Sequence, residues 1–430
     1  MEVAAPAQEE VWLSCALEPE ASAFAVSIVL RLRGSLNVHL LEQALSALVA
    51  RHEVLRTTYH PGLEGLEQRV EAPRRVRVAL CDSQSASEAT VIREEARAPF
   101  DLRRNLALRA RVVGKGFGQH ALILTLHHIA VDGWSMAVLA REFHTIHTAY
   151  VRGERPELEG LTLRYAEFAR LQTARRAAAS TEERLEKVRE RFRVPRLVLD
   201  METEHRDEPY WRADQVRLVF ARTVGKEVEA FGRRARATVF VVLTAVLWIV
   251  LYSRSQCTPF VMACDYANRC DPDASGTIGL FVSQILFRVA IEARMTFAAV
   301  MRQVQEELQQ ALEHAECPVG LLVPNEGTSI AQPFRVKLAF QPGIESPGLQ
   351  GIEVVGAEVV SYGAKCDLLF SVSAERGQTL WELQYRKALF ERDDMAEVLE
   401  QIQATTSLAL RNPQSTVAAL SSCRRAELAS

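Results

Sequence analysis

The chain has 430 residues, more than one hydrophobic core usually carries, so we expect two domains. A formal net charge of −3 gives no sign of nucleic acid or an anionic membrane as the main partner, and the acidic N-terminus lacks the basic region and apolar stretch of a signal peptide. The eight cysteines form no Cys-x-x-Cys pair and no cluster with histidine at metal-ligand spacing, so we expect a cytoplasmic protein with reduced thiols and no metal.

The first part of the chain alternates between strand and helix patterns. The predicted elements are a strand ending at 30–32, a helix over 39–51, a strand over 54–59 and a hairpin of 106–113 with 120–126. The glycine-rich residues 114–118 join the two hairpin strands. They resemble a phosphate-binding loop only superficially, because a strand and not a helix follows them. We therefore expect a hairpin turn there.

Two adjacent histidines, His127 and His128, end the second strand of this hairpin, and three apolar residues separate them from Asp132 and Gly133. An amphipathic helix follows, and Ser135 stands where an N-cap residue is expected. Neighbouring side chains of a strand point to opposite faces, so one histidine should pack inward and the other face a cleft, where it could act as a general base. Asp132 could orient a histidine or pair with a distant arginine. The alternative is a core histidine and a surface histidine beside an ordinary turn.

The second part of the chain again mixes helices with strands. The charged residues 174–193 predict a solvated helix, and the polar, proline-containing sequence after it is the best candidate for a connection between lobes. Residues 239–252 are apolar but too short for a membrane span, so they predict a core helix. The other predicted elements are strands at 215–220, 260–264, 278–289, 336–341, 351–360, 367–372 and 380–385, and helices at 225–236, 296–315 and 395–408. We expect two comparable α/β lobes, residues 1–180 and 195–430, connected by 181–194.

Several common catalytic signatures are absent from the sequence. It contains no Gly-x-Ser-x-Gly elbow, no Walker loop and no dinucleotide fingerprint. No covalent nucleophile or redox centre is evident.

Six motifs follow one another along the chain. They are residues 5–12, 51–57, 127–135, 165–169, 278–288 and 314–319. The second, Arg-His-Glu-Val-Leu-Arg-Thr, and the third, His-His-x-x-x-Asp-Gly, match best, whereas the sixth is degenerate. In order and separation the motifs resemble those of condensation domains of nonribosomal peptide synthetases, within the superfamily that includes chloramphenicol acetyltransferase. The resemblance covers nearly the whole chain.

The resemblance implies an α/β fold of two chloramphenicol-acetyltransferase-like lobes in a V-shaped pseudo-dimer, with the active site in a tunnel at their interface. Peptidyl or acyl carrier proteins would deliver donor and acceptor as phosphopantetheine thioesters, so no intrinsic cofactor is expected. The resemblance leaves open whether the acceptor is instead a small molecule. We expect a monomer without a nucleic-acid or membrane partner.

The resemblance also implies roles for individual residues. His128 would face the tunnel and either deprotonate the attacking amine or hydroxyl or hold it in line, while His127 would pack and position. Asp132 would be structural and pair with Arg288 from the other lobe. The backbone amide of Gly133 is a candidate oxyanion donor. The remaining expected site residues are Arg56, as further support, and Trp134, Ser135, Ser283 and Gln284, along the substrate tunnel.

Two motifs depart from the family pattern. Ser283 and Gln284 stand where the fifth motif usually has Asn-Thr, and the sixth lacks its usual Gln-Asp and Phe-Glu. These positions lie near the acceptor side in the family, so we expect an unusual acceptor, with drift in a degenerate enzyme as the alternative.

The leading hypothesis is transfer of a carrier-bound acyl or aminoacyl group to an amine or hydroxyl, giving an amide or an ester in nonribosomal peptide or hybrid natural-product biosynthesis. One rival is a polyketide-associated or coenzyme-A-dependent acyltransferase with the same motif. Another is a non-catalytic condensation-like platform that recruits partner proteins. No adenylation or carrier sequence is visible, so we expect a free-standing enzyme, with an excised synthetase domain as the alternative.

Overall fold

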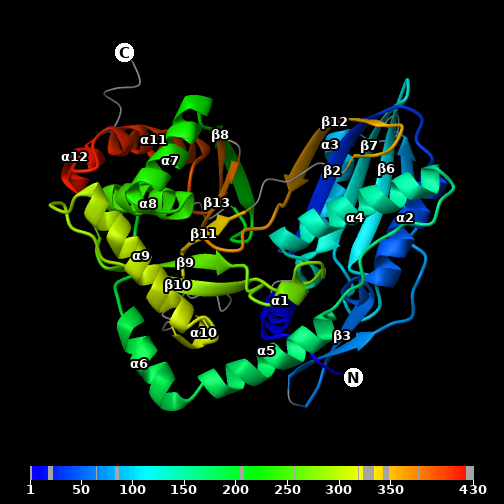
Figure 1. Cartoon of the computed structure of the whole chain (residues 1–430), viewed down its shortest axis with the longest axis horizontal. Coiled ribbons are helices and arrows are strands. Elements are labelled where there is room, and N and C mark those ends of the chain that lie inside the picture. The colour runs from blue at the N-terminus through cyan, green and yellow to red at the C-terminus, as the bar shows by residue number, and fades with distance from the viewer. Residues whose placement is uncertain are drawn as a thin grey trace. The chain divides into compact units, whose positions relative to one another are not determined.

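The computed structural model describes residues 2–17, 23–63, 65–82, 87–203, 208–255, 257–317, 319–322, 334–341, 348–375 and 377–422. The chain divides into two compact units (Figure 1). The first consists of Met1–Arg175, Ala267–Val282 and Ile344–Gly363, and the second of Arg176–Tyr266, Ser283–Gly343 and Ala364–Ser430. Two later stretches of sequence therefore belong to the first unit, although we expected everything after residue 195 in one C-terminal lobe.

The first unit is built on a five-stranded sheet with the order β12-β2-β7-β6-β5. Its strands are β2 (Ala25–Arg33), β5 (Val78–Asp82), β6 (Leu108–Gly116), β7 (Gln119–His127) and β12 (Glu353–Val360). β6 and β7 form the expected antiparallel hairpin, and β12 pairs antiparallel with β2. The late strand β12 is thus an edge strand of a sheet that is otherwise made from the N-terminal part of the chain.

Helices cover both faces of this sheet because its strands are apolar on both sides. α2 (Val38–Arg51) and α4 (Gly133–Val151) pack on the face that includes Leu30 and Leu124 (Figure 1). α3 (Glu88–Arg97) packs on the opposite face, against Val29 and Ile123. A central strand buried on both faces reads as a continuous apolar run, as residues 121–124 do. A smaller sheet, β1-β4-β3, adjoins α1 (Pro6–Leu17); its strands are β1 (Glu2–Val3), β3 (Thr57–Pro61) and β4 (Leu66–Val70).

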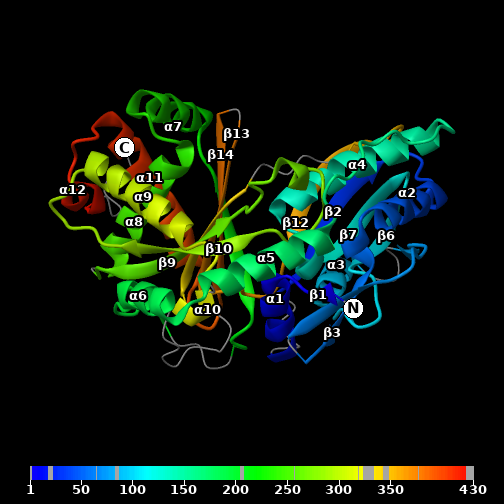
Figure 2. The same ribbon diagram turned by 60° about the horizontal axis from the view of Figure 1, so that its bottom comes forward.

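The second unit is built on a six-stranded mixed sheet with the order β10-β9-β11-β13-β14-β8. The strands are β8 (Ala213–Val219), β9 (Phe260–Tyr266), β10 (Ser283–Val289), β11 (Val336–Phe340), β13 (Leu368–Glu375) and β14 (Gln378–Arg386). The larger core lies on one face, under α7 (Arg222–Ala235), α8 (Val239–Ser255), α9 (Phe297–Glu313), α11 (Arg392–Arg411) and α12 (Val417–Ser421) (Figure 2). On the other face, α6 (Glu182–Phe192) and α10 (Val319–Leu322) bury a smaller apolar cluster.

The predicted α/β character of both halves is confirmed, whereas the V shape and the interface tunnel stay predictions. Some boundaries differ. The predicted strand over 54–59 begins as a short 3-10 turn, η1 (Glu53–Arg56), and becomes β3 only at Thr57. The charged stretch 174–193 is not one helix, because α5 (Tyr165–Ala179) ends at Ala179 and α6 begins at Glu182. The expected connection 181–194 is therefore mostly the helix α6 of the second unit.

Among the described residues, no single helix has the length and apolar composition of a membrane span, although α7 and α8, which meet at a bend of 107°, pass that test together by length and composition.

Candidate active site

The two adjacent histidines lie where the central strand β7 ends. His127 is the last residue of β7 and is paired with Ala25 of β2. His128 opens a 3-10 turn, η2 (His128–Ala130), and its backbone N–H donates to the carbonyl of Phe24 at 2.7 Å. Helix α4 begins at Gly133, shortly after this turn. The sheet therefore fixes one end of the segment and the helix fixes the other, which is how a rigid scaffold aims functional side chains.

His127 is buried, and both nitrogens of its ring have contacts. Its Nδ1 accepts the backbone N–H of Ile129 at 3.2 Å, so the ring proton belongs on Nε2. Nε2 lies 3.6 Å from the Sγ of Cys15 in α1, and the ring meets Phe100 edge to face. Burial raises the pKa of the Cys15 thiol to about 12, so it remains a neutral partner. These contacts fix the orientation of the His127 ring.

His128 is less buried than His127, so the two neighbours face different surroundings. Its ring meets the ring of Phe24 edge to face, with 6.4 Å between centroids. Partial exposure is what a general base needs in order to reach a substrate. The assignment of chemistry to His128 stays a proposal.

Asp132 caps the N-terminus of α4 and is surrounded by donors. Its Oδ1 accepts the backbone N–H of Ser135 at 2.7 Å, and its Oδ2 accepts the backbone N–H of Phe281 at 3.0 Å. The guanidinium of Arg269 completes the set, with Nη2 3.2 Å from Oδ1. The carboxylate thus joins α4 to residues 267–282, which return to the first unit from later in the chain.

The expected pairing of Asp132 with Arg288 is wrong, because the cation that binds this carboxylate is Arg269. Arg288 lies on β10 in the second unit, and its backbone N–H donates to Glu307 of α9. Arg269 is held by more than Asp132, since its Nη1 donates to the carbonyl of Thr277 at 2.8 Å and its guanidinium lies over the ring of Phe281. Burial lowers the pKa of Arg269, and the neighbouring Asp132 opposes that shift.

We expected Ser135 to be the N-cap of the helix and to line the tunnel, and its contacts are consistent with neither role. The N-cap is Asp132, three residues earlier, and Ser135 is fully buried. Its hydroxyl donates to the carbonyl of Gly279 at 2.7 Å and accepts from the amide of Gly279 and from Arg269. Every bonding position of this hydroxyl is therefore used inside the unit.

Trp134 and Gly133 occupy the exposed side of the same helix start. Trp134 is 44 % exposed, and its indole Nε1–H donates to the carbonyl of Ser275 at 3.0 Å. Gly133 is the first residue of α4 and is exposed. The first amides of a helix have no partner within it, which suits Gly133 to the predicted oxyanion role.

The second motif forms a buried cluster that holds α4 in place. His52 Nε2 lies 2.7 Å from Oε2 of Glu142, and Arg51 donates to both oxygens of that carboxylate. Burial favours the neutral acid, but the hydrogen bonds from His52 and Arg51 outweigh it and hold the pKa of Glu142 below its ordinary value. Arg56 supports the loop after α2 by donating to the carbonyls of Val49 and Glu71.

Close packing fixes the segment 267–282 against the fourth motif. The Tyr165 hydroxyl donates to the carbonyl of Leu280 at 2.6 Å, and its ring meets Phe281 edge to face. A Cβ at Gly279 would lie 1.9 Å from Cδ2 of Tyr165, so only glycine fits there. Sequence reasoning missed Arg269 and Glu142, because neither lies in a matched motif.

Ser283 and Gln284 begin β10 in the second unit, opposite Tyr266 and Asp265 of β9. Both are partly buried. Their place along a substrate tunnel stays a prediction. Of the degenerate sixth motif, Pro318 lies outside the described residues.

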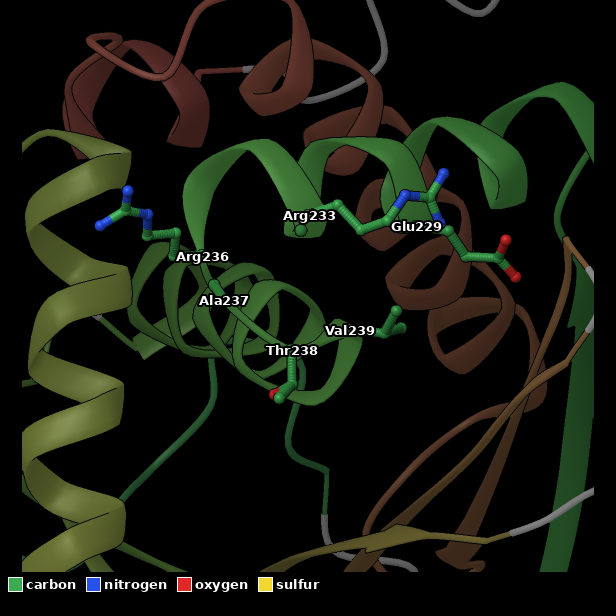
Figure 3. A pocket seen from close by; sticks show the side chains of 7 residues that line it. Glu229, Arg233, Arg236, Ala237, Thr238 and Val239 are labelled. Carbon is green, nitrogen blue, oxygen red and sulfur yellow. The ribbon is translucent and has the colours of Figure 1, made fainter.

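Within the described ranges, no group of three or more His, Cys, Asp or Glu side chains could hold a metal ion. A shallow depression on the second unit lies where α7 meets α8, lined by residues from Glu229 to Val239 (Figure 3). Its two arginines do not converge, since Arg233 extends towards Glu229 while Arg236 points towards α9.

Comparison with known proteins shows what this architecture is similar to. The family model for the condensation domain matches residues 2–429. The chain is 27 % identical over 420 residues to chondramide synthase cmdD from Chondromyces crocatus, covering 95 % of this chain and 11 % of that protein. It is 26 % identical over 401 residues to malpinin synthetase from Mortierella alpina, covering 90 % and 5 %. The chain thus spans only a small part of these curated relatives.

Solved structures show the same fold. The X-domain from teicoplanin biosynthesis matches with a TM-score of 0.82 at 23 % identity, covering 97 % of each chain. The first condensation domain of the CDA synthetase matches with a TM-score of 0.74 at 19 % identity, covering 97 % of this chain and 98 % of that one. The condensation domain of the monacolin K polyketide synthase MokA matches with a TM-score of 0.82 at 17 % identity, covering 97 % and 98 %.

Proposed function

This chain belongs to the condensation domain family, and we propose that it transfers an acyl or aminoacyl group from a carrier-protein thioester to an amine or hydroxyl acceptor. Domains of this family act on substrates carried by phosphopantetheine and need no cofactor of their own. The observation that carries the proposal is the complete His-His-x-x-x-Asp-Gly segment, with a partly exposed His128 between a buried His127 and a helix start capped by Asp132.

The proposed chemistry needs only groups that this segment supplies. The acceptor nitrogen or oxygen attacks the thioester carbonyl, and His128 takes the proton that the nucleophile loses. The amide of Gly133 donates to the oxygen that becomes negative in the tetrahedral intermediate. When the intermediate collapses, the C–S bond breaks and the proton leaves with the thiol of the carrier. For an amine that arrives neutral, holding the nucleophile in line is the larger contribution of His128.

The division of labour between the histidines follows from their contacts. Protonating Nδ1 of His127 would break its bond from Ile129, and Nε2 faces Cys15. His127 therefore serves as a positioning residue. The bonds to Asp132 from Ser135, Phe281 and Arg269 hold the turn so that His128 keeps its place.

The partners of the proposed reaction are carrier proteins. The curated relatives are synthases and synthetases of which this chain matches only a small part, which favours donor delivery by a carrier. Trp134, Ser283 and Gln284 are each proposed to contact a substrate. Because Ser283 and Gln284 replace the usual Asn-Thr, we propose an acceptor unlike the common carrier-bound amino acid.

The test is intact-mass analysis of carrier proteins loaded with candidate donors, incubated with the chain and a panel of amines and alcohols. We expect loss of the donor mass from the carrier together with a new amide or ester. The same donor on coenzyme A is expected to react much more slowly. Equal or faster reaction from coenzyme A would instead support the rival, a coenzyme-A-dependent acyltransferase.

A second candidate function is recruitment of a partner protein without catalysis. It is favoured by the likeness to the teicoplanin X-domain, which has also been solved in complex with OxyB and matches this chain with a TM-score of 0.80. The complete His-His-x-x-x-Asp-Gly segment favours catalysis instead. Product formation with any donor and acceptor, lost in His128→Ala, would dispose of the recruitment role as the sole function.

A further inference from the structure

Phe100 contacts both the buried imidazole of His127 and the guanidinium of Arg109. It meets the His127 ring edge to face, with 5.4 Å between the ring centroids. The Cζ atom of Arg109 lies over the Phe100 ring, 3.9 Å from its centroid, which is the geometry of a cation–π contact. Phe100 is partly buried, and neither it nor Arg109 belongs to one of the six sequence motifs. Two residues that the motifs do not mark are therefore connected to the buried histidine of the candidate site.

Strand register explains why Arg109 and His127 share one face of the five-stranded sheet. The backbone N–H of His127 donates to the carbonyl of Ala107, and Arg109 is two residues further along the chain, in β6. Side chains two residues apart on a strand point to the same face. This face is the one covered by α3, because Val113, four residues beyond Arg109, packs in the apolar cluster formed with that helix. Arg109 therefore points towards α3 and the stretch that follows it, which contains Phe100.

Arg109 is held by the end of α3 and the residues that follow this helix. Its Nη2 donates to the carbonyls of Glu95 and Ala98, each at 2.9 Å, and its Nη1 donates to the carbonyl of Pro99 at 2.8 Å. Its Nε lies 3.4 Å from Oε2 of Glu95. The planar guanidinium is a rigid fork, so these bonds restrict both ends of the contact. Because Pro99 directly precedes Phe100, they also fix the backbone from which the Phe100 ring projects.

The ring of His127 in turn holds the start of the turn that carries His128. Its Nδ1 accepts the backbone N–H of Ile129, so the His127 side chain caps the 3-10 turn η2. Ile129 is fully buried. Rotation of the His127 ring would move Nδ1 away from this N–H and leave a buried donor without its acceptor. The orientation of the His127 ring therefore affects the backbone on both sides of His128.

We propose that Phe100, held by Arg109, is a positioning residue for the condensation reaction. Its ring keeps the imidazole of His127 in the orientation that caps η2, and the capped turn keeps His128 in place. The inference rests on the proposed function, which assigns the attacking nucleophile to His128. Phe100 acts through His127 and not on the substrate itself. Its contribution is geometric, and a small displacement of a reacting group is enough to slow a reaction greatly.

The first measurement is hydrogen exchange of the Ile129 amide, followed by NMR in the wild type and in Phe100→Leu. Leucine keeps an apolar side chain but lacks the flat ring that meets His127. We expect Ile129 to exchange roughly tenfold or more faster in this variant, because its bond to Nδ1 is formed less often. The amide of Ile123, in the middle of β7, should exchange as in the wild type. Phe117→Leu, at the exposed tip of the same hairpin, is the matched control and should change neither amide.

The second measurement is the single-turnover rate of product formation from a carrier-loaded donor, over a range of acceptor concentrations. Phe100→Leu should lower the maximal rate by roughly 10–10² and leave the half-saturating acceptor concentration within about twofold, because it displaces the reacting groups without removing a binding contact. Arg109→Met should do the same, since it releases Phe100. The double variant should be no slower than the slower single variant, because both changes act through one ring. Arg111→Met is the matched control and should keep the wild-type rate, since Arg111 binds the same Glu95 carboxylate from two residues further along β6.

Thermal melting followed by circular dichroism shows whether Phe100→Leu and Arg109→Met are folded, and either folded variant is sufficient for the test. The inference is overturned if Ile129 exchanges at the wild-type rate in the folded variants, or if they form product at the wild-type rate. It is also overturned if the control variants, Phe117→Leu or Arg111→Met, lower the rate as much.

The two measurements separate this inference from the proposed function. Faster exchange of Ile129 in Phe100→Leu, together with full activity of His128→Ala, would reject only the role of His128. Product formation that depends on His128 but not on Phe100 would reject only the positioning role.

Discussion

Asp132 and Arg269 form a buried ion pair between residues that stand 137 positions apart in the sequence. The pair joins the start of α4 to the segment 267–282, and each side chain is only 4 % exposed. Asp132 also accepts two backbone N–H groups, so it fixes both the turn after His128 and the returning segment. The ion pair is therefore the internal support of the proposed catalytic histidine.

Arg269→Met should destabilise the first unit by roughly 3–5 kcal/mol, because it leaves the carboxylate of Asp132 buried without its cation. Arg288→Met is the matched control, since the structure gives Arg288 no part in this support, and it should cost much less. Thermal or urea unfolding followed by circular dichroism measures both. Equal losses of unfolding free energy in the two variants would contradict the assignment of the supporting role to Arg269 rather than to Arg288.

Gly279→Ala should destabilise the chain by roughly 1–3 kcal/mol or more, because its Cβ would overlap the ring of Tyr165 at 1.9 Å. Gly276→Ala, three residues earlier, is the control: a Cβ there meets nothing within 4 Å, and we expect a change within about 0.5 kcal/mol. A shift in melting temperature that is the same for both variants would show that the segment 267–282 is not packed against Tyr165.

Stability should depend on pH through Glu142. Because His52 and Arg51 lower the pKa of this carboxyl in the folded chain, ionised Glu142 adds stability that is fully present above its ordinary pKa of 4.5. That stability is lost as the pH falls through the lower folded value. The wild type should therefore melt above Glu142→Gln at pH 7, and the gap should close as the solution is acidified below 4.5. A gap that stays constant between pH 7 and pH 3 would contradict this reading.

Cys15 should react slowly with iodoacetamide, because burial raises its pKa to about 12 and thiolate is the reactive form. Cys270 is exposed and should react before Cys15. Peptide mapping of the alkylated chain over time gives the order. Once Cys15 is modified, its contact with His127 is lost, so condensation activity should fall with Cys15 labelling and not with Cys270 labelling. Rapid labelling of Cys15 would show that α1 does not shield the thiol.

The sequence predicts the individual helices and strands of this fold better than it predicts how they assemble. Periodicity located the bounds of α2 and β7 to within one residue and those of β6 to within three, because their apolar patterns match the helix and strand repeats closely. It also predicted a strand near β12. It could not show that β12 pairs with β2 across more than three hundred residues, since local pattern says nothing about which sheet an edge strand joins.

The sequence likewise predicted some residues of the candidate site and missed others. The motif pointed to His127, His128 and Asp132, and the strand repeat anticipated that the two histidines would differ in burial. The partner of Asp132 was missed because Arg288 ends the fifth motif whereas Arg269 precedes it, and nothing in the sequence says which of the two belongs to the first unit. Ser135 was misread for a related reason, because its hydroxyl is consumed by Gly279 of that returning segment.

The central claim is that His128 acts on the attacking nucleophile. It is tested most directly by the single-turnover rate of product formation from a carrier-loaded donor, comparing the wild type with His128→Ala. We predict a rate lower by about 10²–10⁴, the usual contribution of a positioned acid–base group, with melting temperature and carrier binding unchanged. An unchanged rate in a folded His128→Ala chain would contradict the account.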